Sequence, residues 1–270
     1  MEQRVNSPRL NLSAVSLSYV RDGASFPVVG SVSMRLNAGE FVVFVGPSGC
    51  GKSSLLRMIA GLEQPSAGHI EHDGCAISGP GAGRALVFQS YANLPWLRVD
   101  ENIAFGLSLR GIPKAASRRH VDELLVAVGL QDHAKSYPNE LSGGMQQRLA
   151  IARTLAIEPP VLLMDEPFGA LDPLTRRSMQ RLVRQVVSDR GTTVVFVTHD
   201  TEEAVFVGDR VFVFSPRPAR VVSEVEILLP ERRGDLVESV SFREFEHVVR
   251  TALRAGLHET ANEKHAGVDA

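Results

Sequence analysis

Residues 46–54 read GPSGCGKSS and directly follow the apolar run FVVFV at residues 41–45. A short apolar run bounded by glycine is typical of a buried β-strand. The apolar pattern of residues 55–60 predicts a helix that ends at Gly61. Glycines let the backbone turn tightly, so that successive N–H groups and the N-terminus of the helix face one place. The stretch therefore predicts a strand, an anion-binding loop and a helix.

The loop satisfies the pattern G-x-x-x-x-G-K-[ST], in the strand-to-helix context that this phosphate-binding pattern requires. In it, Lys52 reaches the β- and γ-phosphates of a nucleotide, and the hydroxyl of Ser53 ligates Mg²⁺. The alternative, a glycine-rich turn with a solvated lysine, is the weaker interpretation because every fixed position is present. The residues predicted to line the nucleotide are Gly46, Pro47, Ser48, Gly49, Cys50, Gly51, Lys52, Ser53 and Ser54.

A second apolar run, VLLMDEP at residues 161–167, is long enough for a buried strand and ends in two carboxylates. Side chains that follow one another on a strand point in opposite directions, so the two carboxylates are expected to have different roles. Asp165 suits the Mg²⁺ shell, and Glu166 can orient or deprotonate an attacking water. An acidic pair that closes a strand is more often a solvated turn, but the lysine loop favours the functional interpretation.

His199 follows a third apolar run at residues 194–198 and is expected at the same edge of the sheet as the other two motifs. A lone histidine in this place is usually structural or exposed to solvent. A neutral imidazole beside a γ-phosphate could instead donate a hydrogen bond and report whether that phosphate is present.

The stretch LSGGMQQRLAIARTLA, residues 141–156, predicts a helix with Ser142 as its N-cap and with two glycines, Gly143 and Gly144, in its first turn. This is a second helix N-terminus without bulky side chains, and it is open to anions. An ordinary capped helix is an equally good interpretation of the stretch taken locally. One chain with two phosphate-facing loops for one nucleotide predicts a two-fold dimer, in which the glycine loop of one subunit lies opposite the capped helix of the other.

The order of the remaining patterns indicates an α/β fold with a helix-covered parallel sheet. Residues 10–19 and 28–36 alternate as antiparallel strands, joined to the core by a turn at residues 37–40. The further strands are expected at 161–164, 193–197 and 211–214, and the further helices at 115–128, 146–157, 174–189 and 201–207. We expect one domain over residues 1–230 with a helical subdomain inserted at about 90–157. Residues 231–270 form a C-terminal extension with a helix near 242–253 and a polar end that frays from residue 256.

Composition restricts the class of protein. The 270-residue chain is 44% hydrophobic and has a formal net charge of −2, which leaves no basic surface for nucleic acid and no electrostatic membrane anchor. No stretch approaches the roughly 20 apolar residues that span a bilayer, and the start lacks an apolar signal core. We therefore expect a cytoplasmic protein with reduced thiols at Cys50 and Cys75, whose contact with a membrane is made through another protein.

Taken together, the motifs resemble those of the ATP-binding subunit of an ATP-binding cassette (ABC) transporter, from Leu10 to about Pro230. In the family's order and spacing they are Walker A (46–53), the Q-loop glutamine Gln89, the signature LSGGM (141–145), Walker B (161–166), the D-loop (169–172) and the switch histidine His199. The resemblance implies an α/β P-loop NTPase (RecA-like) core, an N-terminal antiparallel β subdomain and an inserted helical subdomain.

The resemblance also implies roles for individual residues. Tyr19 would stack on adenine, and Gln89 would join the metal shell and link the catalytic site to a membrane subunit; the alternatives are an ordinary strand aromatic and an exposed polar residue. Glu166, His199 and Gln89 would take part in hydrolysis. The residues that would contact the nucleotide across a dimer are Ser142, Gly143, Gly144 and Asp172. Met145 departs from the general LSGGQ signature, which affects only the fine contacts near the γ-phosphate.

The function implied is an importer ATPase, in which two copies close on two MgATP and drive an integral membrane permease at the cytoplasmic face of the membrane. Residues 79–111 and 215–220 are similar to importer subunits for sulfonate, taurine or nitrate, which work with a periplasmic or lipid-anchored solute-binding protein. Sulfonate or taurine is the first expectation for the solute, nitrate or cyanate the second, and a pyrimidine-type vitamin precursor the third. Trp96 would either meet the permease or pack inside the helical subdomain.

Two other classes are weighed against this one. A soluble ABC ATPase that acts on nucleic acid or ribosomes usually carries a long coiled-coil insertion or two cassettes, and neither is found here. A P-loop kinase or GTPase is disfavoured for two reasons. The sequence lacks the N-K-x-D motif that recognises guanine, and the LSGGM stretch would have no function in such an enzyme.

Overall fold

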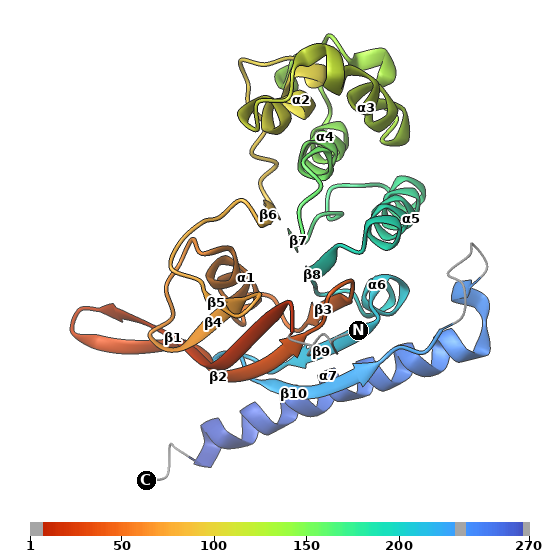
Figure 1. The fold of residues 1–270 in the computed structure, drawn as a ribbon. Helices are drawn as coiled ribbons and strands as arrows, with labels where there is room; N and C mark the ends of the chain where they lie inside the picture. Colours follow the sequence, from red (N-terminus) through yellow and green to blue (C-terminus); the bar gives the residue numbers. More distant parts are fainter. Residues whose placement is uncertain (1–7, 230–235, 267–270) are drawn as a thin grey trace, which may run out of the picture. The chain divides into compact units, whose positions relative to one another are not determined.

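In the computed structural model the run that precedes the glycine loop forms strand β3 (Phe41–Val45; Figure 1). All five of its residues are buried. The structure describes residues 8–229 and 236–266. The chain divides into two units, the first built from Met1–Gly81 with Thr193–Ala270 and the second from Ala82–Thr192. The glycine loop and His199 belong to the first unit, and the signature stretch and the acidic pair belong to the second.

The parallel part of the first unit is centred on β3. Strands β8 (Thr193–Thr198) and β9 (Arg210–Phe214) pair with it in parallel on either side, and β10 (Val221–Glu226) pairs antiparallel with β9. Because parallel strands are covered on both faces, they are continuous apolar runs, as observed here. Helices α1 (Lys52–Ala60) and α6 (Thr201–Val207) follow β3 and β8, which confirms the predicted parallel α/β order.

An antiparallel sheet forms the rest of the β structure of the first unit. Its strand order is β2-β1-β4-β5, with β1 (Leu10–Arg21), β2 (Ala24–Leu36), β4 (Ala67–His72) and β5 (Cys75–Ala76). Buried and more exposed residues alternate along β1 and β2, because one face of such a sheet packs on the core. The expected antiparallel pair at the start of the chain is confirmed.

The chain beyond β10 ends in helix α7 (Val240–Ala266), which follows a short 3-10 turn at Leu236–Glu238. The predicted helix near residues 242–253 is confirmed, but the prediction that the chain frays from residue 256 is wrong for the described residues up to 266. Gly256 packs so closely on β10 that a Cβ there would lie 3.1 Å from a methyl carbon of Val222. The residues that follow, LHETANEKHA, are also mostly good helix formers. Residues 267–270 lie outside the described residues.

The second unit combines two parallel strands, β6 (Arg84–Val87) and β7 (Val161–Asp165), with four helices. The helices are α2 (Val99–Leu109), α3 (Lys114–Ala127), α4 (Gly143–Ala156) and α5 (Pro173–Arg190), and 3-10 turns lie at Gln131–His133 and Pro138–Glu140. Helix α2 was not predicted, because Gly106 interrupts its pattern. Helices α2 to α4 lie within the expected helical segment, whose status as an inserted subdomain stays a prediction.

Helix α1 ends at Gly61, which adopts the left-handed conformation at a φ of 78°. A Cβ at this position would also collide with the backbone carbonyl of Gly79. We expect Gly61→Ala to lower the free energy of unfolding by at least about 3 kcal/mol, because backbone strain and a collision add together. Urea unfolding of the full chain measures this change.

The matched control is Gly191→Ala. Gly191 ends α5 in the same left-handed conformation, but no atom lies within 4 Å of an added Cβ. The strain alone should cost about 1 kcal/mol there. Equal losses of stability in the two variants would contradict the role of the Gly61–Gly79 contact.

Candidate functional site

The loop between β3 and α1 depends on glycine for its shape. Gly49 and Gly51 have φ values of 73° and 126°, which side chains other than glycine rarely adopt. A Cβ on Gly51 would lie 2.6 Å from the carbonyl oxygen of Val28 on β2. The loop is therefore held in one conformation by neighbouring backbone. Gly51 is the N-cap of α1, and because it has no side chain, no side-chain hydrogen bond caps the first turn of the helix. The N–H groups of that turn face the loop, as in phosphate-binding sites.

Lys52 is the cation of this loop, and it is only 4% exposed. Its ammonium donates hydrogen bonds to the carbonyl oxygens of Gly46 (2.7 Å) and Pro47 (2.8 Å) and lies 3.7 Å from the sulfur of Cys50. A buried ammonium needs such partners. Ser53 and Ser54 are partly exposed in the first turn of α1. The loop thus concentrates one positive charge, two hydroxyls and the N-terminus of a helix, which fits a polyphosphate.

Tyr19 lies on β1 and is 43% exposed. Its hydroxyl donates a 2.5 Å hydrogen bond to the carboxylate of Glu63, just beyond α1. This hydrogen bond is the main reason why the pKa of Tyr19 is raised; burial adds to the effect, and a hydrogen bond with Ser54 partly opposes it. The structure therefore places Tyr19 beside the glycine loop. Glu63 was not predicted, because no local pattern marks a glutamate in a loop as the partner of a distant tyrosine.

His199 follows β8, and the register of the sheet sets its position. The last residues of β3 and β8, Val45 and Thr198, are directly paired, so the glycine loop and His199 both follow the same end of the sheet. The expectation that they share a sheet edge is confirmed for these two motifs. The Thr198 hydroxyl is buried and donates a 2.5 Å hydrogen bond to Glu203, and Asp200 caps α6. Glu203 was missed because acidic residues are common in the first turn of a helix, as Glu202 and Glu203 are here.

In the second unit, Ser142 is the N-cap of α4, as predicted, and its hydroxyl accepts a hydrogen bond from the N–H of Met145 (3.3 Å). The helix begins at Gly143 rather than at Gln146. A Cβ on Gly144 would lie 3.4 Å from Leu171 and 3.5 Å from the carbonyl oxygen of Ala170, in the D-loop segment. The fold thus brings the signature stretch and the D-loop segment into contact.

A further contact to the signature stretch comes from the segment that follows Gln89. A Cβ on Gly143 would lie 3.1 Å from the hydroxyl of Tyr91. The side chain of Asn93 donates to the carbonyl of Gln146 (2.9 Å), and Arg153 donates to the carbonyl of Ala92 (2.6 Å). The segment after Gln89 is therefore fastened along α4. Gln89 itself is exposed in the loop after β6.

The acidic pair lies where β7 ends. Asp165 is its last residue and is buried, whereas Glu166 is partly exposed and has a φ of 44°. The argument from alternating strand side chains is therefore wrong for Glu166, because its backbone has left the strand. A left-handed conformation at a residue other than glycine is strained, and such strain is concentrated at functional sites. It makes Glu166 a stronger candidate than its sequence context did.

Asp172 is the N-cap of α5, where its carboxylate accepts a hydrogen bond from the N–H of Thr175 (3.1 Å). The hydrogen bonds with Thr175 lower the pKa of Asp172. This structural role accounts for the aspartate locally, and its contact with a nucleotide stays a prediction.

The turn that carries Trp96 is built by one buried side chain, Asn102. Its amide nitrogen donates to the carbonyls of Leu94 (3.1 Å), Leu97 (2.8 Å) and Arg98 (3.1 Å), and its oxygen accepts from the N–H of Leu94 (2.9 Å). Trp96 is 69% exposed on this turn, which excludes the alternative in which it packs inside the helical subdomain.

The predicted metal ligands agree with the chemistry of Mg²⁺. They offer oxygen atoms from Ser53 in the first unit and from Gln89 and Asp165 in the second. The described residues contain no group of three or more His, Cys, Asp or Glu side chains that could hold a metal ion. Mg²⁺ needs none, because it binds one or two carboxylates together with phosphate oxygens and waters. The residues therefore fit a metal that arrives with a nucleotide.

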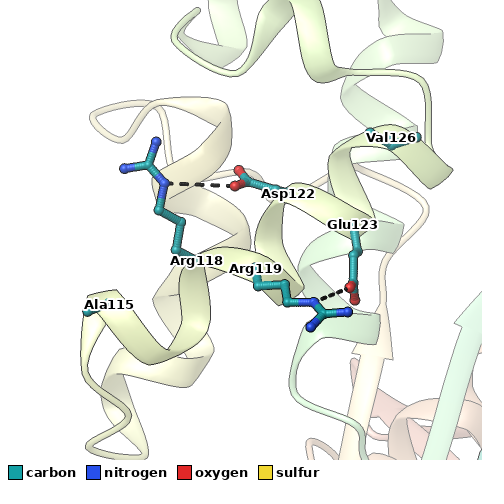
Figure 2. Close-up of a pocket in the computed structure, with 6 residues that line it drawn as sticks. All are labelled: Ala115, Arg118, Arg119, Asp122, Glu123 and Val126. Atoms are coloured by element: carbon teal, nitrogen blue, oxygen red, sulfur yellow. Dashed lines mark hydrogen bonds and ion pairs between the residues drawn. The ribbon is translucent and has the colours of Figure 1, made fainter.

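A hollow elsewhere on the second unit involves none of the predicted site residues. It lies along one face of α3, where Arg118 pairs with Asp122 and Arg119 with Glu123 (Figure 2). All four side chains are mostly exposed, and exposed ion pairs of this kind contribute little energy. We read this face as a solvated helix surface.

The comparisons with known proteins agree with this arrangement. The family model for ABC transporters matches residues 29–169. The chain is 45% identical over 219 residues to a taurine import ATP-binding protein of Roseobacter denitrificans, covering 81% of this chain and 82% of the relative. It is 44% identical over 221 residues to a nitrate import ATP-binding protein of Synechocystis, covering 82% and 83%.

Among solved structures, the chain is similar to a dimeric ATP-binding cassette in a post-hydrolysis state bound to ADP and Pi. The TM-score is 0.74 at 31% sequence identity, and the match covers 83% of this chain and 99% of the other. None of the described helices is both long enough and apolar enough to cross a membrane.

The Tyr19–Glu63 hydrogen bond leads to a test of the site's geometry. The bond stabilises the neutral phenol, and the carboxylate also opposes the charge of a phenolate. We therefore expect Glu63→Ala to lower the pKa of Tyr19. The absorbance of tyrosinate during a pH titration of the full chain measures it, and Tyr19→Phe identifies which transition belongs to this residue. An unchanged Tyr19 transition in Glu63→Ala would show that the hydrogen bond does not form in solution.

Proposed function

The chain belongs to the ABC transporter family, and we propose that it is the ATP-hydrolysing subunit of a membrane importer for a small solute. The observation that carries the proposal is the glycine loop, where Lys52 and the N-terminus of α1 converge at the edge that also carries His199. The similarity to import ATP-binding proteins over most of the chain supports the direction of transport. The relatives named above give no support to an action on nucleic acid.

Nucleotide binding is assigned to the first unit. Lys52 exchanges its loop carbonyl partners for the β- and γ-phosphate oxygens of ATP, which are stronger acceptors for an ammonium because they are charged. The N–H groups of residues 46–54 surround the same phosphates. Tyr19 stacks on the adenine, with its ring held by Glu63.

Hydrolysis is assigned to the metal ligands, the acidic pair and the switch histidine that the sequence motifs identify. Ser53, Gln89 and Asp165 hold Mg²⁺, and the chemistry that this ion supplies when bound is neutralisation of charge on the transferred phosphoryl oxygens. Glu166 orients and deprotonates the attacking water. His199 donates a hydrogen bond to the γ-phosphate, which stabilises the charge that develops there.

The active form is a homodimer. Ser142, Gly143 and Gly144 contact the γ-phosphate bound by the partner's glycine loop, and Asp172 lies at the same boundary between subunits. Two observations support this form. The chain has two phosphate-facing helix N-termini for each nucleotide, and the solved cassette to which it is similar is dimeric and bound to ADP and Pi.

Coupling to transport is assigned to the segment from Gln89 to Trp96. The exposed indole of Trp96, on a turn fixed by Asn102, is a rigid apolar contact for an integral permease at the cytoplasmic face of the membrane. The segment is also bonded to α4, so a movement at the permease reaches the signature stretch directly. A periplasmic or lipid-anchored binding protein delivers the solute to the permease.

For the solute we propose a sulfonate of the taurine type, with nitrate as the second candidate. Relatives of both names match the chain at nearly equal identity, and taurine is placed first because taurine import proteins of several further bacteria are also at least 40% identical to the chain.

The assignment of Glu166 leads to a variant test. We expect Glu166→Gln to bind ATP and to form a dimer, but to hydrolyse ATP at least about 100-fold more slowly, because the amide cannot accept the proton of the water. ATP turnover and size-exclusion chromatography with MgATP measure both properties. Glu123→Gln, on the exposed face of α3, is the control and should behave as wild type. Normal turnover in Glu166→Gln would refute the assigned role.

The transport proposal is tested by growth. A strain without this chain should fail to grow on taurine or an alkanesulfonate as sole sulfur source and should grow normally on sulfate. The wild-type chain should restore growth, and Lys52→Ala should not, because the phosphates lose their cation. If growth is equal on every sulfur source, sulfonates are excluded as the essential substrate, and nitrate as sole nitrogen source is tested in the same way.

A further inference from the structure

Helix α7 packs on the first unit through one face, where it contacts α6, β9 and β10 (Figure 1). Phe242 and Val249 on this face are almost completely buried. Glu246 lies between them, four residues after the first and three before the second, and is therefore on the same face. A carboxylate within a buried apolar face is costly unless it is bonded, so its partners are informative.

Glu246 is bonded through both carboxylate oxygens. One accepts a hydrogen bond from the hydroxyl of Thr201, at 3.2 Å, and the other pairs with Arg250, at 3.1 Å on the next turn of α7. The side chain of Glu246 is only 22% exposed. Thr201 is the first residue of α6 and lies two positions after His199. The C-terminal helix is thus tied by a side chain to the segment that carries the histidine.

The residues on either side of His199 are held by hydrogen bonds. Before it, the buried Thr198 hydroxyl donates to Glu203 and accepts from the N–H of Asp200, at 3.1 Å. After it, the Asp200 carboxylate accepts from the N–H groups of Glu202 and Glu203. The Thr201–Glu246 bond is the contact in this set that comes from a different part of the chain, 45 positions away.

We propose that Glu246 is a positioning residue for ATP hydrolysis, and that α7 acts through it to hold the His199 segment in place. The inference rests on the proposed ATPase function. An exposed histidine at the end of a strand can meet a γ-phosphate only if its backbone is held to within a fraction of an ångström. Without the bond to Glu246, the start of α6 is held by the Asp200 cap and by packing. His199 is then positioned less accurately, which reduces the rate of the chemical step more than it reduces the affinity for ATP.

The test compares four variants of the full-length chain by steady-state ATP hydrolysis and by equilibrium binding of MgATP. We expect Glu246→Ala and Thr201→Val to lower kcat by roughly three- to tenfold, which corresponds to the net contribution of a typical intramolecular hydrogen bond, with KM and Kd for MgATP changed less than twofold. Glu246→Gln should retain most of kcat, because its amide oxygen still accepts from Thr201. Glu244→Ala, which removes an exposed carboxylate from the same helix, should match wild type.

The double variant Glu246→Ala with Thr201→Val separates positioning from general stability. Because each change removes the same Thr201–Glu246 hydrogen bond, the double variant should lose no more kcat than either single variant. Two results would overturn the proposal: a kcat for Glu246→Ala equal to that of Glu244→Ala, or losses in kcat and ATP affinity that follow a loss of thermal stability in every variant, including Glu246→Gln. If the wild-type chain itself does not hydrolyse ATP, the proposed function fails, and this inference fails with it.

Discussion

The parallel pairing of β3 with β8 and β9 is the constraint on which the first unit depends. All five residues of β3 and all six of β8 are buried, so these strands are stable only inside a sheet that is covered on both faces. Burial sets the register, and the register brings Val45 level with Thr198. The glycine loop and His199 are neighbours for this reason, although more than 140 residues separate them in the chain.

Three of the side chains proposed to act on the nucleotide or the permease, those of Tyr19, Trp96 and His199, are exposed, and buried or partly buried polar groups hold their segments. Glu63 holds Tyr19, Asn102 holds the turn of Trp96, and Glu203 and Glu246 hold the segment of His199. An exposed side chain loses conformational freedom when it binds, and fixing its surroundings beforehand reduces that cost. Polar residues in the interior of this protein are therefore as informative about function as the motifs are.

The fold was predictable where one local signal was strong. The continuous apolar runs identified β3, β7, β8 and β9, and the alternating pattern identified β1 and β2. Strands β4, β5, β6 and β10 were missed because they are partly exposed, lack a continuous apolar run and depend on their neighbours for hydrogen bonds. The end of α7 was misjudged for a related reason: its close packing at Gly256 on Val222 joins residues that no sequence pattern connects.

The order of residues along the chain determined the chemistry of the site: which loop offers glycines and a lysine, where carboxylates close a strand, and which serine caps a helix. These properties depend on neighbours within about four positions in the chain, a distance over which the periodicity of helices and strands can be recognised in the sequence. Only the tertiary structure decided the left-handed backbone of Glu166, the exposure of Trp96 and the bond between Glu246 and Thr201. None of these features follows a local periodicity, and the Glu246–Thr201 bond joins segments 45 positions apart, a kind of contact that leaves no periodic trace in a single sequence.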